Sequence, residues 1–327
     1  MKKFSLGVWA HGIKNYGDSA EGVEGHVARL ADAGFDLIIP CVKNPPGAVD
    51  FLTDVADVND DYPQWDPLKV LIEQCRQRGI RVHPWFCVFV EGEKSRLLRE
   101  HPEYEAKNEG DSKLRWACAM RPEVQDYLHN LYVSLAERYQ PDGLHLDYIR
   151  TGGLCKCDYC KQQMAEQGVD IEDAAWATPP FERWTQWRTG RITDFVRRMR
   201  RYTAEHDLEL SAAVFRDYPQ SVPSQGQDWV AWADEGLVEL LFPMNYDESE
   251  VNVRRLTREH VKLVGDKVQL WEGLMRGKLT SEQLTRQVRA VFQLRAKGAV
   301  LFHYPALTDE DLAAIKSYID SVPYLRQ

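Results

Sequence analysis

Short apolar segments alternate with longer amphipathic segments along the whole chain, and this alternation constrains the fold more than any other feature. The apolar segments are nearly continuous hydrophobic runs, which is typical of parallel strands covered on both faces. Eight of them are predicted strands: Phe4–Trp9, Asp36–Cys41, Arg81–Phe89, Gly143–Ile149, Glu209–Phe215, Leu237–Asn245, Lys267–Trp271 and Gly298–His303.

The segments between these strands carry helix signals. The third has one apolar face, formed by Val124, Leu128, Leu131 and Leu135. The last begins with Thr308 as a predicted N-cap, with Asp311 three residues later. Glycines that follow helical segments are expected to end them in the left-handed conformation: Gly34, Gly79, Gly236, Gly265 and Gly298.

Eight strands alternating with eight helices indicate an α/β fold, the (β/α)8 TIM barrel, as a single domain over residues 1–327. A doubly wound sheet is the alternative, but no Gly-x-Gly-x-x-Gly follows the first strand. Two long loops are predicted, at about 90–120 after the third strand and 151–182 after the fourth. Both belong to the C-terminal face of the barrel, where active sites of this fold lie.

Composition narrows the classes of partner. The hydrophobic content of 44% excludes wholesale disorder, and the net charge of −9 argues against nucleic-acid binding. No run approaches the ~20 apolar residues of a membrane span. The apolar run after Met1-Lys2-Lys3 is too short for a signal peptide, so we expect a cytoplasmic protein.

An acidic residue interrupts the fourth predicted strand. In the segment Asp142–Arg150, His145 and Asp147 alternate with leucines. An aspartate inside a strand is disfavoured, and a buried carboxylate is costly unless it is paired. A structural pair with Arg150 is one interpretation. We favour a functional carboxylate, because the end of this strand faces the barrel cavity.

The sixth and seventh predicted strands also end in polar residues. Asn245, Tyr246 and Asp247 can hydrogen-bond a hydroxyl-rich ligand, although Asp247 can equally cap the next helix. Glu272 follows Trp271, a carboxylate beside an aromatic ring that suits a sugar site, but Glu272 can equally be a rim charge.

Further candidates lie near other strand ends. Asp217 follows the fifth strand and is a third candidate acid, or simply a turn residue. Trp9, Trp85, Trp116 and Trp271 can stack on sugar faces, or can fill the barrel core.

Four histidines near strand ends, His11, His83, His145 and His303, raise the alternative of a metal-dependent hydrolase. The first strand lacks the His-x-His that such enzymes usually show, and a lone histidine is more often packed and hydrogen-bonded.

Cysteines cluster after the fourth strand. The spacing Cys155-x-Cys157-x-x-Cys160 fits a structural zinc site, with Cys118 of the preceding loop as the predicted fourth ligand. Reduced, packed cysteines are the alternative. The total of seven cysteines is odd, which does not suit a closed disulfide framework.

Seven segments, taken together and in this order, form a motif pattern specific enough to indicate a protein family. They are Gly79–Phe86, His101–Tyr104, Pro122–Leu128, Asp142–Arg150, Gln227–Trp229 with Trp232, Pro243–Tyr246, and Gly298–Pro305. In these segments the chain resembles the glycosyl hydrolase-like family 10 proteins and related glycosidase barrels, over about residues 4–320.

The resemblance implies a TIM barrel that acts on glycosidic bonds, with Asp147 as the catalytic carboxylate. Two departures stand out. Relatives often continue with Tyr-Pro after the arginine, whereas Thr151 and Gly152 follow Arg150 here. A carboxylate after the tyrosine at the end of the sixth predicted strand, Tyr246 here, is not a reliable family feature, so Asp247 rests on its position alone.

We therefore predict a glycoside hydrolase in which two carboxyl groups flank the scissile bond. Asp147 is the predicted nucleophile or base, with its pKa held low by Arg150 and Tyr246. The predicted proton donor is, in order, Asp247, Glu272 or Asp217. The predicted substrate-binding residues are His83, Trp85, Arg150, Asp217, Asn245, Tyr246, Trp271 and His303. No cofactor is expected for catalysis, the expected partner is a carbohydrate, and the oligomeric state stays open. A non-catalytic carbohydrate-binding barrel is the first alternative and a metal-dependent hydrolase the second.

Overall fold

The computed structural model describes residues 4–109 and 113–322. Met1, Lys2 and Lys3, which entered the prediction about targeting, lie outside these ranges. Within the described residues, no helix is long and apolar enough to cross a membrane.

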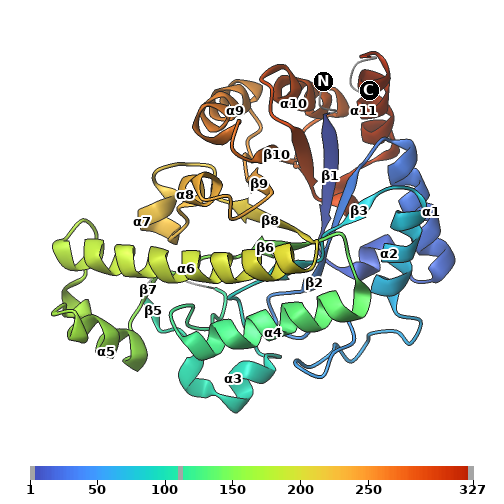
Figure 1. Ribbon diagram of the computed structural model, residues 1–327. Helices are drawn as coiled ribbons and strands as arrows, with labels where there is room; N and C mark the ends of the chain where they lie inside the picture. Colours follow the sequence, from blue (N-terminus) through green and yellow to red (C-terminus); the bar gives the residue numbers. More distant parts are fainter. Residues whose placement is uncertain (1–3, 110–112, 323–327) are drawn as a thin grey trace.

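Parallel strands close into a barrel, which confirms the predicted (β/α)8 architecture (Figure 1). The closure is made by β1, which pairs with β2 on one side and with β11 on the other. The barrel positions are filled by β1 (Ser5–Ala10), β2 (Leu37–Lys43), β3 (Arg81–Val82) with β4 (Trp85–Cys87), β6 (Gly143–Asp147), β8 (Glu209–Val214), β9 (Leu240–Pro243), β10 (Gln269–Met275) and β11 (Gly298–Phe302).

Helices surround the strands as an outer ring (Figure 1). One long helix or helix pair follows each barrel position: α1 (Ala20–Asp32), α2 (Pro67–Gln77), α4 (Pro122–Tyr139), α6 (Pro179–Glu205), α7 (Ser221–Gln225) with α8 (Trp229–Asp234), α9 (Glu250–Val264), α10 (Ser281–Gln293) and α11 (Asp309–Asp320). The predicted apolar face of α4 is buried. Thr308 caps α11 in a reciprocal capping box with Asp311.

The third barrel position is divided, because Pro84 has no backbone N–H to donate to a ladder. The predicted strand Arg81–Phe89 is therefore observed as β3 and β4. The seventh position departs in the other direction. The predicted strand ends at Trp271, whereas β10 continues to Met275, which places Glu272 inside the strand.

Both long loops contain short elements of their own. The first holds α3 (Arg96–Glu100), the 3-10 turn η2 (Pro102–Tyr104) and β5 (Asn108–Glu109). The second holds β7 (Leu154–Cys155), α5 (Asp158–Glu166) and η3 (Ile171–Asp173). Two further 3-10 turns, η1 (Ile13–Tyr16) and η4 (Tyr304–Ala306), follow β1 and β11. Antiparallel pairing of β5 with β7 joins the two loops.

The glycine predictions hold at three of the five helix ends. Gly34, Gly79 and Gly236 have positive φ angles, as a left-handed C-cap requires. The prediction for Gly265 is wrong, because this residue keeps a right-handed conformation at φ −59°. The prediction for Gly298 is also wrong, because Gly298 starts β11. Arg295 takes the left-handed conformation after α10 instead, at φ 67°.

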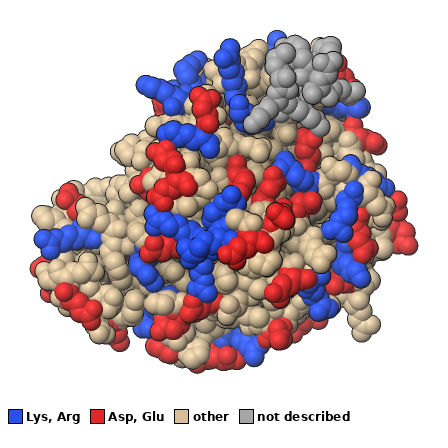
Figure 2. Space-filling view, viewed as in Figure 1, with Lys and Arg blue, Asp and Glu red and all other residues tan. Residues whose placement is uncertain are grey.

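Acidic and basic side chains intermix over the described part of the face in Figure 2. Such mixing gives no broad positive field on this face, which a phosphate backbone would need.

Candidate functional site

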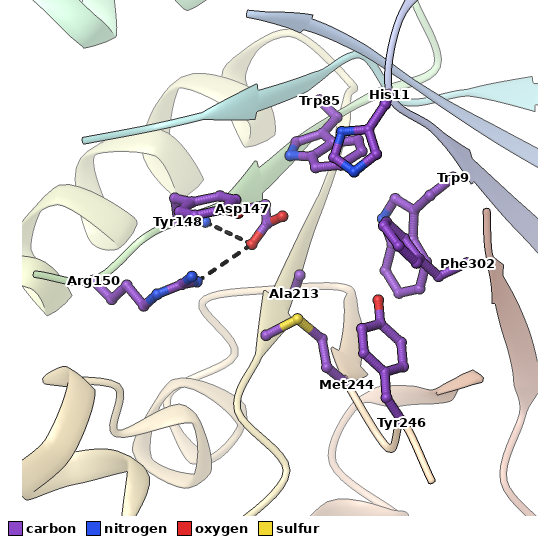
Figure 3. Close-up of a pocket in the computed structure, with 10 residues that line it drawn as sticks. All are labelled: Trp9, His11, Trp85, Asp147, Tyr148, Arg150, Ala213, Met244, Tyr246 and Phe302. Carbon is purple, nitrogen blue, oxygen red and sulfur yellow. Dashed lines mark hydrogen bonds and ion pairs between the residues drawn. The ribbon is translucent and has the colours of Figure 1, made fainter. Parts of the chain in front are cut away.

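A pocket of about 100 Å³ opens at the C-terminal end of the barrel, where the strands present their last residues (Figure 3). Its residues come from β1, β4, β6, β8 and β11 and from the segments that follow β1, β6 and β9. They are Trp9, His11, Trp85, Asp147, Tyr148, Arg150, Ala213, Met244, Tyr246 and Phe302.

Asp147 is the last residue of β6 and is only 7% exposed. The backbone N–H of Tyr148 donates to its Oδ1 at 2.6 Å, and Arg150 Nη1 lies 3.7 Å from the same oxygen. Tyr148 has a left-handed backbone, with φ 49°, which is uncommon for a residue with a side chain. In Figure 3 the second oxygen of Asp147 points away from the Tyr148 N–H and from Arg150, into the pocket.

Burial raises the pKa of Asp147 to about 6. Arg150, the Tyr148 N–H and the Trp85 indole act in the opposite direction but do not outweigh desolvation. The predicted low pKa is therefore wrong, because the strand end is drier than an exposed ion pair. Tyr246 is not among the groups that lower the pKa of Asp147. Burial and the nearby Asp147 raise the pKa of Tyr246 itself well above its ordinary value.

Aromatic rings form the walls of the pocket. The ring centroid of Trp9 lies 6.3 Å from that of Phe302 and 6.4 Å from that of Tyr246. The rings of His11 and Trp85 approach to 4.9 Å on the other side. Flat apolar walls around a carboxylate suit a sugar ring. The C–H groups make the face of such a ring apolar, and the hydroxyl groups make its edge polar.

A hydrogen-bonded chain crosses the barrel interior beneath the pocket. Trp9 donates its indole N–H to His145 Nε2 at 3.1 Å, and His145 Nδ1 lies 2.9 Å from Ser211 Oγ. His83 Nδ1 is also 2.9 Å from that hydroxyl, and His83 Nε2 lies 3.0 Å from Glu209. One direction of donation satisfies every group when both imidazoles are neutral, which agrees with burial lowering the pKa of each.

These hydrogen bonds explain why His83 does not reach the pocket. Glu209 is the first residue of β8, so His83 faces the N-terminal end of the barrel. Trp271 is also deep in the barrel: a Cβ on Gly298 would lie 2.6 Å from its ring, and the Arg81 guanidinium lies 5.5 Å from the ring centroid. Both were predicted to bind substrate, and the structure places both in the core.

Glu272 is fully buried against helix α9. His260 Nδ1 lies 2.9 Å from its Oε1, and Asn245 Nδ2 donates to its Oε2 at 3.0 Å. Burial works against a charged His260, but Glu272 outweighs it and raises the pKa of that imidazole. Glu272 and Asn245 therefore stabilise the packing of β10 and α9 and do not line the pocket.

Asp247 and Asp217 lie outside the residues that line the pocket. The Asp247 carboxylate accepts from the Ser249 N–H at 2.8 Å and pairs with Arg216 at 3.3 Å. Although burial opposes it, these contacts and the Asn252 amide lower the pKa of Asp247. Asp247 thus stabilises the start of α9. The Asp217 side chain is 61% exposed beside Arg216.

The predicted histidines do not assemble as metal ligands at the mouth. The His303 ring lies 5.9 Å from the His11 ring, but His303 itself does not line the pocket. In residues 4–109 and 113–322, the one group of three or more close cysteine, histidine or carboxylate ligands consists of cysteines. It brings together Cys118, Cys155, Cys157 and Cys160, the four residues singled out from the sequence.

Of the predicted site residues, the pocket contains Trp85, Asp147, Arg150 and Tyr246. Trp9 and His11 were recognised near a strand end but were not assigned to the site. Tyr148, Met244, Ala213 and Phe302 were missed. Their shared signal is position, at or next to the C-terminal end of a strand, which the fold alone supplies.

The fold and pocket define a (β/α)8 barrel protein with one buried carboxylate in an aromatic-walled pocket at its C-terminal face. The chain belongs to the glycosyl hydrolase-like 10 family, whose model matches residues 8–287. This confirms the resemblance drawn from the ordered motifs.

Solved structures with the same fold include several glycosidases. An α-L-fucosidase isoenzyme 2 from Paenibacillus thiaminolyticus superposes with a TM-score of 0.72 at 14% identity, covering 99% of this chain and 50% of that one. A β-galactosidase from the psychrophilic Marinomonas ef1 gives 0.71 at 11%, covering 98% and 60%. The catalytic domain of a β-amylase from Paenibacillus polymyxa gives 0.66 at 12%, covering 98% of both chains.

The chain thus spans half the length of that fucosidase and 60% of that galactosidase. No curated protein sequence matches the chain.

Proposed function

We propose that this protein is a glycoside hydrolase whose catalytic carboxylate is Asp147. The observation that carries the proposal is the placement of a buried carboxylate at the end of β6. One of its oxygens accepts a hydrogen bond from the Tyr148 N–H and pairs with Arg150, and the other is directed into the pocket. A carboxylate held in this way has a fixed direction of attack, which a nucleophile or base requires.

The raised pKa suits this role at neutral pH. With a pKa of about 6, Asp147 is mostly ionised at pH 7 and is more basic than an ordinary aspartate. Trp9, Trp85 and Phe302 would hold the sugar ring against it. The family and the fold of the fucosidase, galactosidase and amylase support carbohydrate as the substrate class.

Asp247 is our first choice for the second carboxyl group, because it directly follows Tyr246, which lines the pocket. Glu272 is enclosed by its partners, and Asp217 is turned to solvent. As a proton donor, Asp247 would have to be protonated when substrate binds, against the contacts that lower its pKa in the free protein.

The test uses aryl glycosides of several sugars with wild type and Asp147→Asn. We expect the variant to lose about 10³-fold in kcat/KM, within the range for positioned acid–base groups, while it still binds the sugar product. A variant that keeps wild-type turnover would refute the proposal.

Asp247→Asn tests the second role through the leaving group. If Asp247 protonates the leaving oxygen, the variant loses activity on alkyl glycosides but retains it on dinitrophenyl glycosides, whose leaving group needs no proton. Equal losses on both, or no loss on either, would remove Asp247 from this role.

A non-catalytic carbohydrate-binding barrel is the second candidate function. One observation favours it: among the described residues, Asp147 is the one carboxylate that lines the pocket. Glycan binding measured by calorimetry, with no release of reducing ends over long incubation, would support this function over hydrolysis.

A further inference from the structure

We propose that Cys118, Cys155, Cys157 and Cys160 bind one Zn²⁺ ion that ties together the two long loops and positions one wall of the pocket. All four Sγ atoms lie within 4.8 Å of one another, and all four residues are buried.

The sulfur spacing matches a tetrahedral thiolate site. Cys118 Sγ lies 3.5 Å from Cys160 Sγ, 3.7 Å from Cys157 Sγ and 4.0 Å from Cys155 Sγ. A tetrahedron with Zn–S bonds of about 2.3 Å separates its sulfurs by about 3.8 Å. A disulfide would need about 2.05 Å, and all seven cysteines of the chain are free in this structure.

The local structure of the second loop presents its cysteines together. Cys155 ends β7, Cys157 is the N-cap of α5, and Cys160 lies in the first turn of α5. The Cys-x-x-Cys spacing at the start of a helix is common in zinc sites, and the positive end of the helix dipole favours a thiolate there.

Cys118 comes from the end of the first loop, shortly before α4 begins at Pro122. Its loop is held to the second loop by the β5–β7 pairing, in which Asn108 faces Cys155. Four thiolates around Zn²⁺ carry a net charge of −2. Arg121 contacts both loops: its backbone N–H donates to the Cys118 carbonyl, and its guanidinium lies 4.9 Å from the centre of the Tyr159 ring, between Cys157 and Cys160 in the sequence.

The remaining cysteines provide a contrast within the same chain. Cys75 is buried on α2, and Cys41 and Cys87 lie on β2 and β4. None of these three belongs to the cluster. Burial of a thiol therefore does not by itself create the cluster; the two loops do.

The cluster is connected to the pocket through Trp116, two residues before Cys118. A Cβ on Gly152 would lie 2.5 Å from Trp116 Nε1, so the two loops touch there. The Arg150 guanidinium lies 5.9 Å from the centre of the Trp116 ring and 4.1 Å from that of Tyr148. A metal that fixes both loops therefore fixes Arg150, which contacts Asp147. This last consequence rests on the proposed function; metal binding itself does not.

The test begins with metal content, which does not depend on activity. The full chain is expressed with added zinc, purified under reducing conditions and analysed by mass spectrometry of metals. We expect about one zinc per chain, a large loss of zinc in Cys118→Ser and in Cys157→Ser, and full retention in Cys75→Ala. Iron in place of zinc, a wild type that stays metal-free after Zn²⁺ is added to the reduced protein, or cysteine variants that keep their zinc would each overturn the site.

Two measurements on the wild type keep the test decisive if the variants do not fold. Replacement of zinc by Co²⁺ should give the intense visible bands of tetrahedral thiolate coordination, and octahedral spectra would count against the site. Chelation should make four thiols newly reactive and lower the unfolding midpoint, as loss of a bound metal does. Unchanged thiol reactivity would refute the proposal.

Activity is measured last. If the metal positions Arg150, partial chelation should lower kcat/KM in proportion to the zinc removed, with recovery when zinc is restored. Unchanged activity in zinc-free protein would remove the connection to the pocket, even if the metal stoichiometry stands.

Discussion

Asp147 and Glu272 are both buried carboxylates on barrel strands, but their surroundings differ in one decisive respect. Glu272 has a partner on each oxygen, His260 on one and Asn245 on the other. In Asp147, Tyr148 and Arg150 hold the same oxygen, and the second is directed into the pocket. Burial is thus a poor guide to function, whereas a carboxylate oxygen turned into an open pocket at the barrel mouth indicates a site for a ligand.

The largest expected effect is on stability: replacing Asp147 and replacing Glu272 should change the free energy of unfolding in opposite directions. Because the folded protein raises the pKa of Asp147 to about 6, its ionised form opposes folding at pH 7, by about 3 kcal/mol. Glu272→Ala should instead lower the free energy of unfolding by about 3–5 kcal/mol, because it leaves buried His260 and Asn245 without their partner.

Urea unfolding at pH 7 measures both variants. Asp147→Asn should unfold at the same or a higher urea concentration than wild type, and Glu272→Ala at a clearly lower one. Equal destabilisation by both would mean that Asp147 is as structural as Glu272, and the comparison would fail.

The next effect is on the interior chain that supports Trp9. His145→Leu should lower the free energy of unfolding by about 1–3 kcal/mol, because it leaves a buried indole N–H and the Ser211 hydroxyl without this partner. Thermal unfolding followed by Trp fluorescence checks this, with His101→Leu on the exposed loop as the control. A variant as stable as wild type would show that the chain contributes little.

The pH dependence of activity tests the state of Asp147. If it acts as a nucleophile or base, kcat/KM should rise with pH and level off above about 6, since the group must lose its proton. A profile that falls through this region would assign Asp147 as the proton donor instead.

Arg150→Met should shift the rising part of the pH profile of kcat/KM to higher pH, because Arg150 lowers the pKa of Asp147. The pH profile of this variant is the measurement, with Arg183→Met on the outer helix α6 as the control. An unshifted pH profile would show that the contact between Arg150 and Asp147 at 3.7 Å has little electrostatic effect.

The smallest effect is expected at Asp217. With 61% of its side chain exposed, Asp217→Asn should change the free energy of unfolding by less than about 0.5 kcal/mol and leave kcat/KM near that of wild type. A large loss of activity would place Asp217, rather than Asp247, as the partner of Asp147.

The sequence by itself determined the barrel, because strand and helix periodicities and helix caps are local properties that need no knowledge of distant contacts. It also singled out Asp147, since a carboxylate is disfavoured in an apolar strand and the end of a barrel strand is where this fold places its sites. Cys155, Cys157 and Cys160 were grouped from their spacing, and Cys118 was added because its loop neighbours theirs on the same face of the barrel. Trp85, Arg150 and Tyr246 were placed at the mouth by the same rule of strand ends.

Only the tertiary structure decided the direction of each side chain. Glu272 and Trp271 follow one another on β10, and neither lines the pocket, because a strand that continues to Met275 keeps both below its end. His83 is turned toward Glu209, a residue 126 positions away. The pKa of Asp147 also depends on the tertiary structure, because the burial that raises it comes from the closed barrel, which no local sequence pattern contains.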